Sequence, residues 1–134
     1  MKKVLLAVSM LCISAFSVAG DVTLESAMFT QREAGWKVDV TLKHADTGWD
    51  HYANEWRIVD GQGTVLGRRV LAHPHVDEQP FTRSLFFAKI PPQVSVVFIE
   101  ASDSVHGWSA DRLRVDLSKT KGERYQVQHL RTKK

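Results

Sequence analysis

The segment from Leu71 to Phe81 combines residue types that can bind a metal ion or a polar ligand. It holds two histidines, two acidic residues and two prolines within one short stretch. Pro74 favours extended backbone at His73, and side chains two residues apart in extended chain point the same way. We therefore expect His73 and His75 to project together, where they could coordinate a transition metal or present a polar recognition surface.

Two other polar segments, 45–52 and 103–109, also carry histidine beside acidic and aromatic residues. A nitrogen-rich set of this kind suits Cu(II) or Zn(II), because imidazole favours both ions. The predicted metal ligands are His51, His73, His75 and His106. The alternatives are that these histidines hydrogen-bond the loop backbone as a rigid rim without metal, or that they titrate as a pH sensor.

These three segments, together with the strand that follows the segment Leu71–Phe81, contain further side chains that could contact a ligand. The predicted ligand-binding residues are Trp49, Asp50, Tyr52, Asp77, Glu78, Arg83, Asp103 and Trp108. The aromatic members could form a recognition platform for a sugar, a peptide or an exported protein partner, or they could pack over the open end of the core. The carboxylates could orient the histidine rings, or form a salt-bridge network with Arg69 and Arg83 that fixes the loop geometry.

Catalysis has little support in this sequence. Two carboxylates at one rim could act as general acid and base in a hydrolase, but nothing in the sequence sets their separation. No serine or threonine lies in a nucleophile motif, and no glycine-rich phosphate loop occurs. We therefore predict a non-enzymatic binding protein, with a structural or protein-interaction module as the alternative.

Period-two alternation of apolar and polar residues predicts the elements that must position these side chains. Trp36, Val38, Val40 and Leu42 give the clearest example of a half-buried strand. Seven strands are predicted, over residues 22–29, 36–42, 56–59, 64–71, 81–88, 94–98 and 113–117. Seven short strands in about a hundred residues predict an all-β, antiparallel immunoglobulin-like sandwich, with a small closed barrel as the alternative.

Strand alternation also predicts where the chemistry gathers. Antiparallel neighbours reverse direction at every connection, so segments 45–52, 72–80 and 103–109 should meet at one end of the sandwich. The plain turns between the other strands should meet at the opposite end. In the hairpin centred near Gln62, His51 would face His73, unless a bulge at Gly67 shifts the register by one.

The beginning of the chain has the features of a secretory signal peptide. Two lysines precede the apolar run from Val4 to Phe16, and small residues follow at 17–20. We expect cleavage after Ala19 or Gly20, and no transmembrane anchor, because the run is short and no second one follows. Residues 1–19 are thus predicted as signal peptide, and the mature protein as periplasmic or secreted. The single cysteine, Cys12, lies within this segment without a lipoprotein-type context, so a disulfide-free domain is expected over 20–118.

The net charge of +3 is unevenly distributed. From Lys119 onward six basic residues accompany one glutamate, which predicts a basic, mostly disordered tail over 119–134. Such a tail serves solubility or attraction to an anionic surface. Export and the acidic body disfavour nucleic acid as a partner.

The motifs Thr47–Tyr52 and His73–Ser84, followed by Val105-His106-Gly107, resemble those of a group of small exported bacterial β-sandwich proteins. The resemblance covers most of residues 21–117. It implies an exported single-domain β-sandwich and carries no particular activity with it.

Overall fold

A computed structural model describes residues 21–131, which contain nine strands and no helix. The strands are β1 (Thr23–Arg32), β2 (Gly35–Lys43), β3 (Ala53–Val59), β4 (Val65–Val70), β5 (Phe81–Ala88), β6 (Val96–Asp103), β7 (Gly107–Asp116), β8 (Lys121–Gly122) and β9 (Tyr125–Gln128). Nothing in this part of the chain is a helix that could cross a membrane. The predicted signal peptide, residues 1–19, lies outside the described residues.

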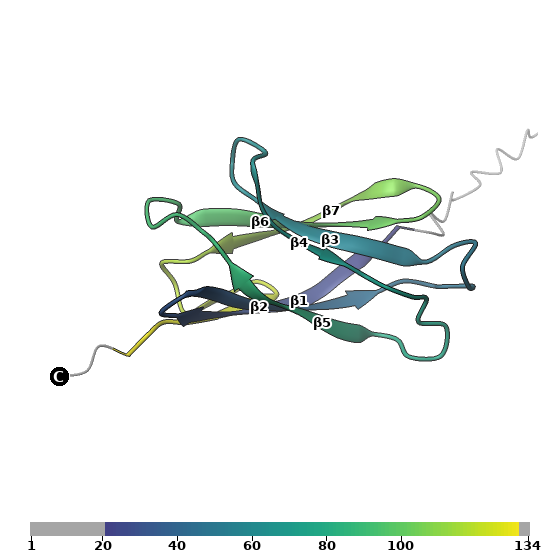
Figure 1. The fold of residues 1–134 in the computed structure, drawn as a ribbon, viewed down its shortest axis with the longest axis horizontal. Coiled ribbons are helices and arrows are strands. Elements are labelled where there is room, and N and C mark those ends of the chain that lie inside the picture. Colours follow the sequence, from purple (N-terminus) through teal and green to yellow (C-terminus); the bar gives the residue numbers. More distant parts are fainter. Residues whose placement is uncertain (1–20, 132–134) are drawn as a thin grey trace, which may run out of the picture.

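The strands form two sheets that pack face to face (Figure 1). One sheet has the order β5-β2-β1-β9-β8, and the other has the order β4-β3-β6-β7. All pairs are antiparallel except β1 with β9. The prediction of an all-β, sandwich-like fold is confirmed, with nine strands in place of the seven predicted.

The core lies between the sheets and follows from the alternation in the sequence. In β2, Trp36, Val38, Val40 and Leu42 are buried, whereas the residues between them are less so. The facing sheet contributes alternate residues in the same way, including the fully buried Trp56. Burying side chains of this size contributes about 1.5–3 kcal/mol each to folding, so these strands hold the site in place.

The prediction of a disordered tail is wrong for the described residues after Lys119. β9 pairs in parallel with β1, Tyr125 opposite Ala27 and Val127 opposite Phe29, and both Tyr125 and Val127 are buried. The apolar alternation in β9 covers only four residues, which is too short to stand out in a basic segment. Its partner strand lies about a hundred residues away, so no local pattern reveals the pairing.

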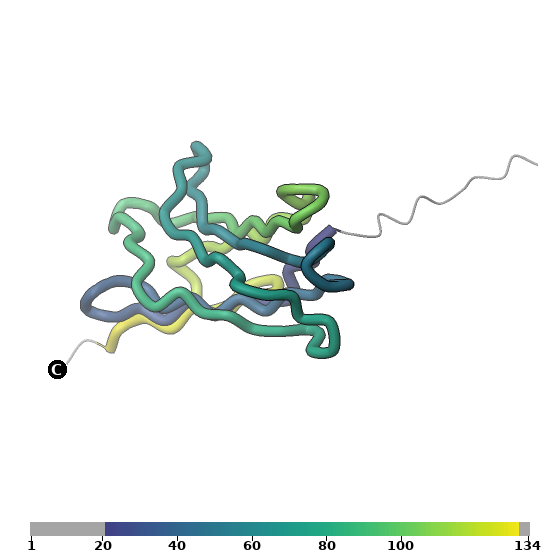
Figure 2. Tube along the Cα trace, turned by 45° about the vertical axis from the view of Figure 1, so that its right-hand side comes forward, coloured from purple at the N-terminus to yellow at the C-terminus, as the bar shows by residue number. Residues whose placement is uncertain are grey.

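The three chemistry-bearing connections, 45–52, 72–80 and 103–109, do meet at one end, at the right of Figures 1 and 2. Hydrogen bonds join them: the N–H of His75 donates to Asp46 at 2.8 Å, and the N–H of Ser104 donates to the carbonyl of Tyr52 at 2.9 Å. We call this the histidine end. The prediction that these three connections converge at one end is confirmed. Only the third joins two strands of a hairpin, since 45–52 and 72–80 cross from one sheet to the other.

The predicted pairing of His51 with His73 is wrong. An irregularity between Ile58 and Val59 shifts the register, so Ile58 faces Gly67. The ladder also ends before it reaches His51, because β3 begins at Ala53. His51 forms an isolated bridge with Gly48 instead.

Candidate metal centre

Three residues from separate parts of the chain bring ligand atoms together at the histidine end. His44 directly follows β2, His51 lies in the next connection, and Asp103 ends β6. One ligand atom from each lies within 4.8 Å of the others. The side chains of His44 and Asp103 are fully buried, and that of His51 is 21% exposed.

The Asp103 carboxylate is held in a fixed orientation. Its Oδ1 accepts hydrogen bonds from the backbone N–H groups of Val105 at 2.8 Å and His106 at 2.6 Å. The His106 ring lies with Nδ1 3.1 Å from Oδ2. Burial alone would raise the pKa of the Asp103 carboxyl, but these hydrogen bonds outweigh it, so that its pKa lies below the usual value. The carboxylate is therefore ionised at neutral pH, as a metal ligand must be.

The two histidine nitrogens approach different oxygens of Asp103, at distances slightly longer than the edge of a tetrahedral site. Asp103 Oδ1 lies 3.5 Å from His51 Nε2, and Oδ2 lies 3.6 Å from His44 Nε2. Metal–ligand bonds of about 2.0–2.1 Å give tetrahedron edges of roughly 3.3 Å. Small side-chain movements would bring these atoms to coordination distance.

Asp46 orients the His44 ring from the side away from Asp103. Its Oδ1 is hydrogen-bonded to His44 Nδ1 and also accepts the N–H of Ala53 at 3.0 Å. Its Oδ2 accepts the N–H of His75 at 2.8 Å. A carboxylate behind one ring nitrogen fixes the other nitrogen toward the metal in many histidine sites, and here it directs Nε2 of His44 toward Asp103.

His51 supplies a buried nitrogen without a hydrogen-bond partner. Its Nε2 is shielded from solvent, and no hydrogen bond reaches it from the described residues. The ring packs edge-on between those of His44, with centroids 4.9 Å apart, and His106, at 5.0 Å. An unpaired buried polar atom costs about 1–3 kcal/mol, which a bound cation would remove.

His73 and His75 form a second pair beside this centre, and they are outside the group of three. Their ring centroids lie 4.5 Å apart, and His75 stacks on Phe81 at 4.0 Å. Arg83 Nη2 donates to His75 Nε2 at 2.6 Å, which occupies that nitrogen with a cationic donor. Burial, followed by the charge of Arg83, lowers the pKa of His75. The structure thus divides the four predicted histidine ligands into two pairs, with His51 and His106 at Asp103.

The other predicted ligand-binding residues surround the histidine end. Trp49 is 68% exposed and packs edge-on against Tyr52, with ring centroids 5.5 Å apart. Trp108 is the second residue of β7, and the Arg57 guanidinium lies 3.6 Å from the centroid of its ring.

The acidic and basic side chains of the loops do not form the predicted salt-bridge network. Asp50, Asp77 and Glu78 are exposed, and Glu78 lies 3.8 Å from Arg83. Arg69 does not join them: it donates to the carbonyl oxygens of Ser84 and Val70. The proposed salt-bridge network around the loop is therefore reduced to one exposed pair, which stabilises the fold by no more than about 1 kcal/mol.

His44 and Asp46 are absent from the predicted set. The signal for His44 was present, because it continues the inward phase of Trp36, Val38, Val40 and Leu42 by one more step. An inward-facing histidine at the end of a buried row needs a polar partner. Asp46, two residues on and also buried, is that partner.

No family model and no solved structure matches the chain. Over 98 residues the chain is 39% identical to a protein from Halomicrobium mukohataei that bears the name "Putative lipoprotein". The matched part is 72% of this chain and 45% of that protein. The chain therefore spans less than half the length of the relative that it matches.

Proposed function

We propose that this chain is an exported, non-enzymatic binding protein that holds a transition metal ion, Zn(II) or Cu(II), at its histidine end. His44, His51 and Asp103 are the ligands, and His106 is the fourth donor. The observation that carries the proposal is the buried Nε2 of His51, which lies beside a fixed carboxylate and has no hydrogen-bond partner among the described residues.

Export is supported from two directions. The first twenty residues have the pattern of a secretory leader. The relative's name, lipoprotein, belongs to proteins of the cell envelope, and transferred to this chain it agrees with a periplasmic or secreted location. The pairing of β2 with β5 and of β3 with β6 supports an immunoglobulin-like class of sandwich, as in the small exported proteins that this chain resembles.

The donor set accounts for the chemistry of binding. Two or three imidazole nitrogens and one carboxylate oxygen are ligands that Zn(II) and Cu(II) both accept. Asp46 keeps His44 Nδ1 occupied, so His44 coordinates through Nε2. His106 Nδ1 lies 3.1 Å from Asp103 Oδ2, which places its ring beside the same carboxylate.

The proposal is tested by titrating the mature protein with Zn(II) and with Cu(II) in a calorimeter. We expect one ion per chain, and about tenfold or greater loss of affinity in His51→Gln, because one ligand is removed. Zinc affinity should also fall in His106→Gln, because the fourth donor is removed. Retention of full affinity in His51→Gln would disprove the site.

The double variant His73→Gln plus His75→Gln is the matched control. It removes two neighbouring imidazoles of the same end and leaves the Asp103 group intact. If this variant loses the metal while His51→Gln keeps it, the ion belongs to the His73 and His75 pair, as the wider set predicted from sequence allows.

A protein-interaction role without metal is the second candidate. Trp49, Val76 and Val105 are each more than half exposed, at 68%, 52% and 57%, around a rim that is fixed by hydrogen bonds. Exposed aromatic and aliphatic side chains on a rigid frame are typical of a docking surface. Absence of metal binding in the wild-type protein would favour this role.

A further inference from the structure

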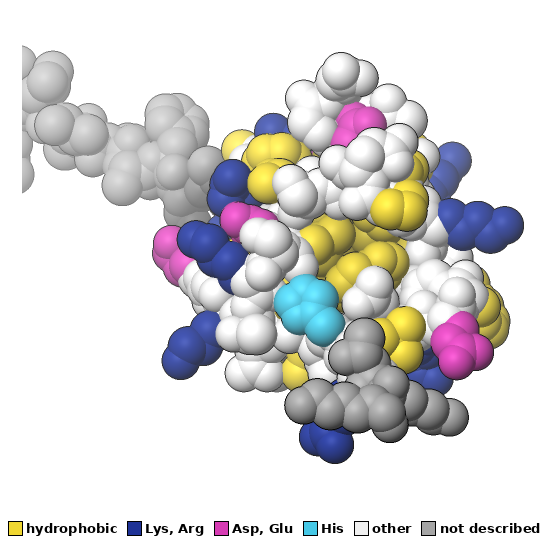
Figure 3. All heavy atoms as spheres, turned by 90° about the vertical axis from the view of Figure 1, so that its left-hand side faces the viewer, with side chains coloured by type: hydrophobic (Ala, Val, Ile, Leu, Met, Phe, Trp, Pro, Cys, Tyr) yellow, Lys and Arg dark blue, Asp and Glu magenta, His cyan; other side chains and the backbone are white. Residues whose placement is uncertain are grey.

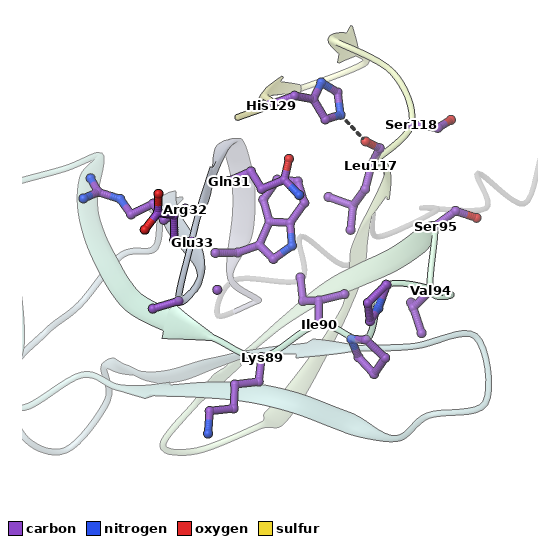
Figure 4. A pocket seen from close by; sticks show the side chains of 15 residues that line it. Gln31, Arg32, Glu33, Lys89, Ile90, Val94, Ser95, Leu117, Ser118 and His129 are labelled. Atoms are coloured by element: carbon purple, nitrogen blue, oxygen red, sulfur yellow. Dashed lines mark hydrogen bonds between the residues drawn. The ribbon is translucent and has the colours of Figure 1, made fainter. Parts of the chain in front are cut away.

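A cavity opens at the end of the sandwich opposite the histidine end. It has a volume of about 610 Å³ and lies among the β1–β2 turn, the connection from β5 to β6 and the segment after β7. Figure 3 shows it as a hollow with an apolar surface, and Figure 4 shows the side chains that line it. We call it the end cavity. Pockets for small molecules commonly have volumes of about 300–1,000 Å³.

The floor of the end cavity is apolar because the core is left open there. Trp36 and Leu117 belong to the core cluster, and Ile90 and Val94 pack against it while remaining partly exposed. Above them the His129 ring lies edge-on to Trp36, and its Nε2 donates to the Leu117 carbonyl at 2.6 Å (Figure 4). This contact ties His129, which follows β9, to the segment that follows β7.

The rim depends on a close backbone approach that only glycine allows. Gly35 has φ +140°, and a Cβ at this position would lie 2.8 Å from the carbonyl oxygen of Ala88. The β1–β2 turn therefore reaches the end of β5 directly. The connection that follows β5 contains Pro91 and Pro92, whose fixed φ angles restrict it. The cavity is thus preformed.

The charges at the rim favour an anionic group. Arg32 and Lys89 line the opening, with Glu33 as the single acidic side chain of the lining. Within residues 21–131 neither Arg32 nor Lys89 has a carboxylate within salt-bridge distance. Two cations at the mouth of an apolar cavity, with no ion-pair partner among the described residues, attract a ligand with an apolar body and a negative head.

We propose that the end cavity binds a single-chain amphiphile with an anionic head group, such as an alkyl carboxylate. The alkyl chain lies against Trp36, Ile90 and Val94, where it removes apolar surface from water. The carboxylate remains at the mouth, near Arg32 and Lys89. This site is independent of the metal centre, since it lies at the other end of the sandwich and shares no residue with it.

The experiment titrates the mature, full-length chain with decanoate below its micelle concentration, followed by amide and indole nitrogen–proton correlation spectra. We expect saturable shifts at the Trp36 indole and at the amides of Ile90 and Val94. Decyltrimethylammonium, with the same chain and a cationic head, should bind about tenfold more weakly, since the rim repels it.

Variants assign the two halves of the ligand. Arg32→Gln and Lys89→Gln should each weaken decanoate binding about threefold, as expected for solvent-exposed charge pairs, whereas Lys43→Gln on β2, at the other end, should leave it unchanged. Ile90→Glu should remove saturable binding, and Val70→Glu, an apolar position on β4 outside the cavity, should not. The dispersion of the spectra shows which variants are folded.

Two results would overturn the proposal. If the Trp36 indole gives no saturable shift with decanoate, the end cavity is not the site. If the cationic amphiphile binds as tightly as decanoate, or if Lys89→Gln and Lys43→Gln behave alike, the rim does not select an anionic head.

Discussion

Two buried carboxylates, Asp46 and Asp103, hold the histidine end together. His44 lies between them, with Nδ1 on Asp46 and Nε2 directed toward Asp103. Each carboxylate also accepts two backbone N–H groups. Those on Asp46 come from Ala53 and from His75 in another connection, whereas those on Asp103 come from Val105 and His106 in its own connection. The loops are therefore fixed by side-chain acceptors where sheet hydrogen bonds have ended.

Replacing Asp46 should destabilise the protein more than any exposed carboxylate does. Asp46→Ala leaves the ring N–H of His44 and the backbone N–H groups of Ala53 and His75 without their acceptor. Each buried unsatisfied donor costs about 1–3 kcal/mol, so we expect a loss of about 3 kcal/mol or more in the free energy of unfolding, measured in urea. The exposed Asp77→Ala is the control and should change stability by less than about 0.5 kcal/mol. Equal effects of the two substitutions would contradict the role given to Asp46.

His75 should make stability depend on pH in a defined direction. Burial lowers its pKa in the folded state, and the charges of Arg83 and His73 lower it further, against the opposite influence of Asp46 and Glu78. The unfolded chain, with a histidine pKa of about 6.5, then binds more protons than the folded chain as the solution is acidified. The stabilisation that the neutral His75 contributes is complete above the unfolded pKa of about 6.5. It is lost as the pH falls from that value toward the lower pKa of His75 in the folded protein.

The measurement is the free energy of unfolding at about pH 7.5, 6.5 and 5.5 in metal-free buffer. His75→Gln should flatten the decline toward acid pH, because it removes the titrating group. Gln128→Ala, at an exposed and uncharged residue of β9, should leave the slope as it is. A slope unaffected by His75→Gln would contradict the assignment.

At the scale of single residues the sequence singled out some members of the histidine end and missed others. His51, Asp103 and His106 were recognisable because they stand in polar loops, where histidine and aspartate have no packing role. His44 and Asp46 were hidden, since His44 ends an apolar row and Asp46 resembles an ordinary turn residue before Thr47-Gly48. The division of the histidines into two pairs depends on side-chain contacts, chiefly of Arg83 with His75, which no spacing in the sequence encodes.

At the scale of strands, alternation predicted β2 over nearly its whole length but only the second halves of β3 and β7, whose first halves lack regular apolar alternation. Because successive strands reverse direction, every second connection lies at the same end of the sandwich, and this alone predicted that the three loops meet. The register was less predictable: the irregularity near Gly67 moves every pair beyond it by one position. The glycine was visible in the sequence, and the structure adds that the Leu85 side chain occupies the space that a Cβ would take there.

The β1–β2 turn offers a test of the close approach described above. Gly35→Ala would need φ +140° and a Cβ 2.8 Å from the Ala88 oxygen, so we expect a loss of about 2–3 kcal/mol in the free energy of unfolding. Gly61→Ala is the matched control, since nothing lies within 4 Å of its Cβ position and its φ is not positive. Thermal and urea unfolding of both variants measure the difference. Similar stabilities would show that the turn relaxes freely.

The packing of β9 against β1 can be tested by substitution of its buried valine. Val127→Ala removes two buried methyl groups and should cost about 1.5–2.5 kcal/mol. Gln128→Ala, the next residue in the same strand and exposed, should have an effect below about 0.5 kcal/mol. A tail that did not pack would give two variants of equal stability in urea.

At the scale of the whole molecule the two proposed sites lie at opposite ends of one rigid sandwich. Zinc at about 100 times its dissociation constant should stabilise the fold by about 2.7 kcal/mol, a rise of roughly 10 °C in the melting temperature. Decanoate bound at the end cavity should also stabilise the folded state, by an amount set by its concentration relative to its dissociation constant. Because the sites share no residues, the free energies from the two ligands should add within about 0.5 kcal/mol. Calorimetric melting with each ligand and with both measures this, and a large departure from additivity would show coupling through the core.

The parallel pairing of β1 with β9 also governs when the protein can fold. Ribosomes and secretion channels deliver a chain beginning with its N-terminus, so β1 emerges long before Tyr125–Gln128 do. During that interval β1 has only one of its two neighbours, and its other edge stays open to wrong partners. The five-stranded sheet is complete only once Tyr125–Gln128 have been released, so the domain that contains it reaches its final fold after β9 emerges.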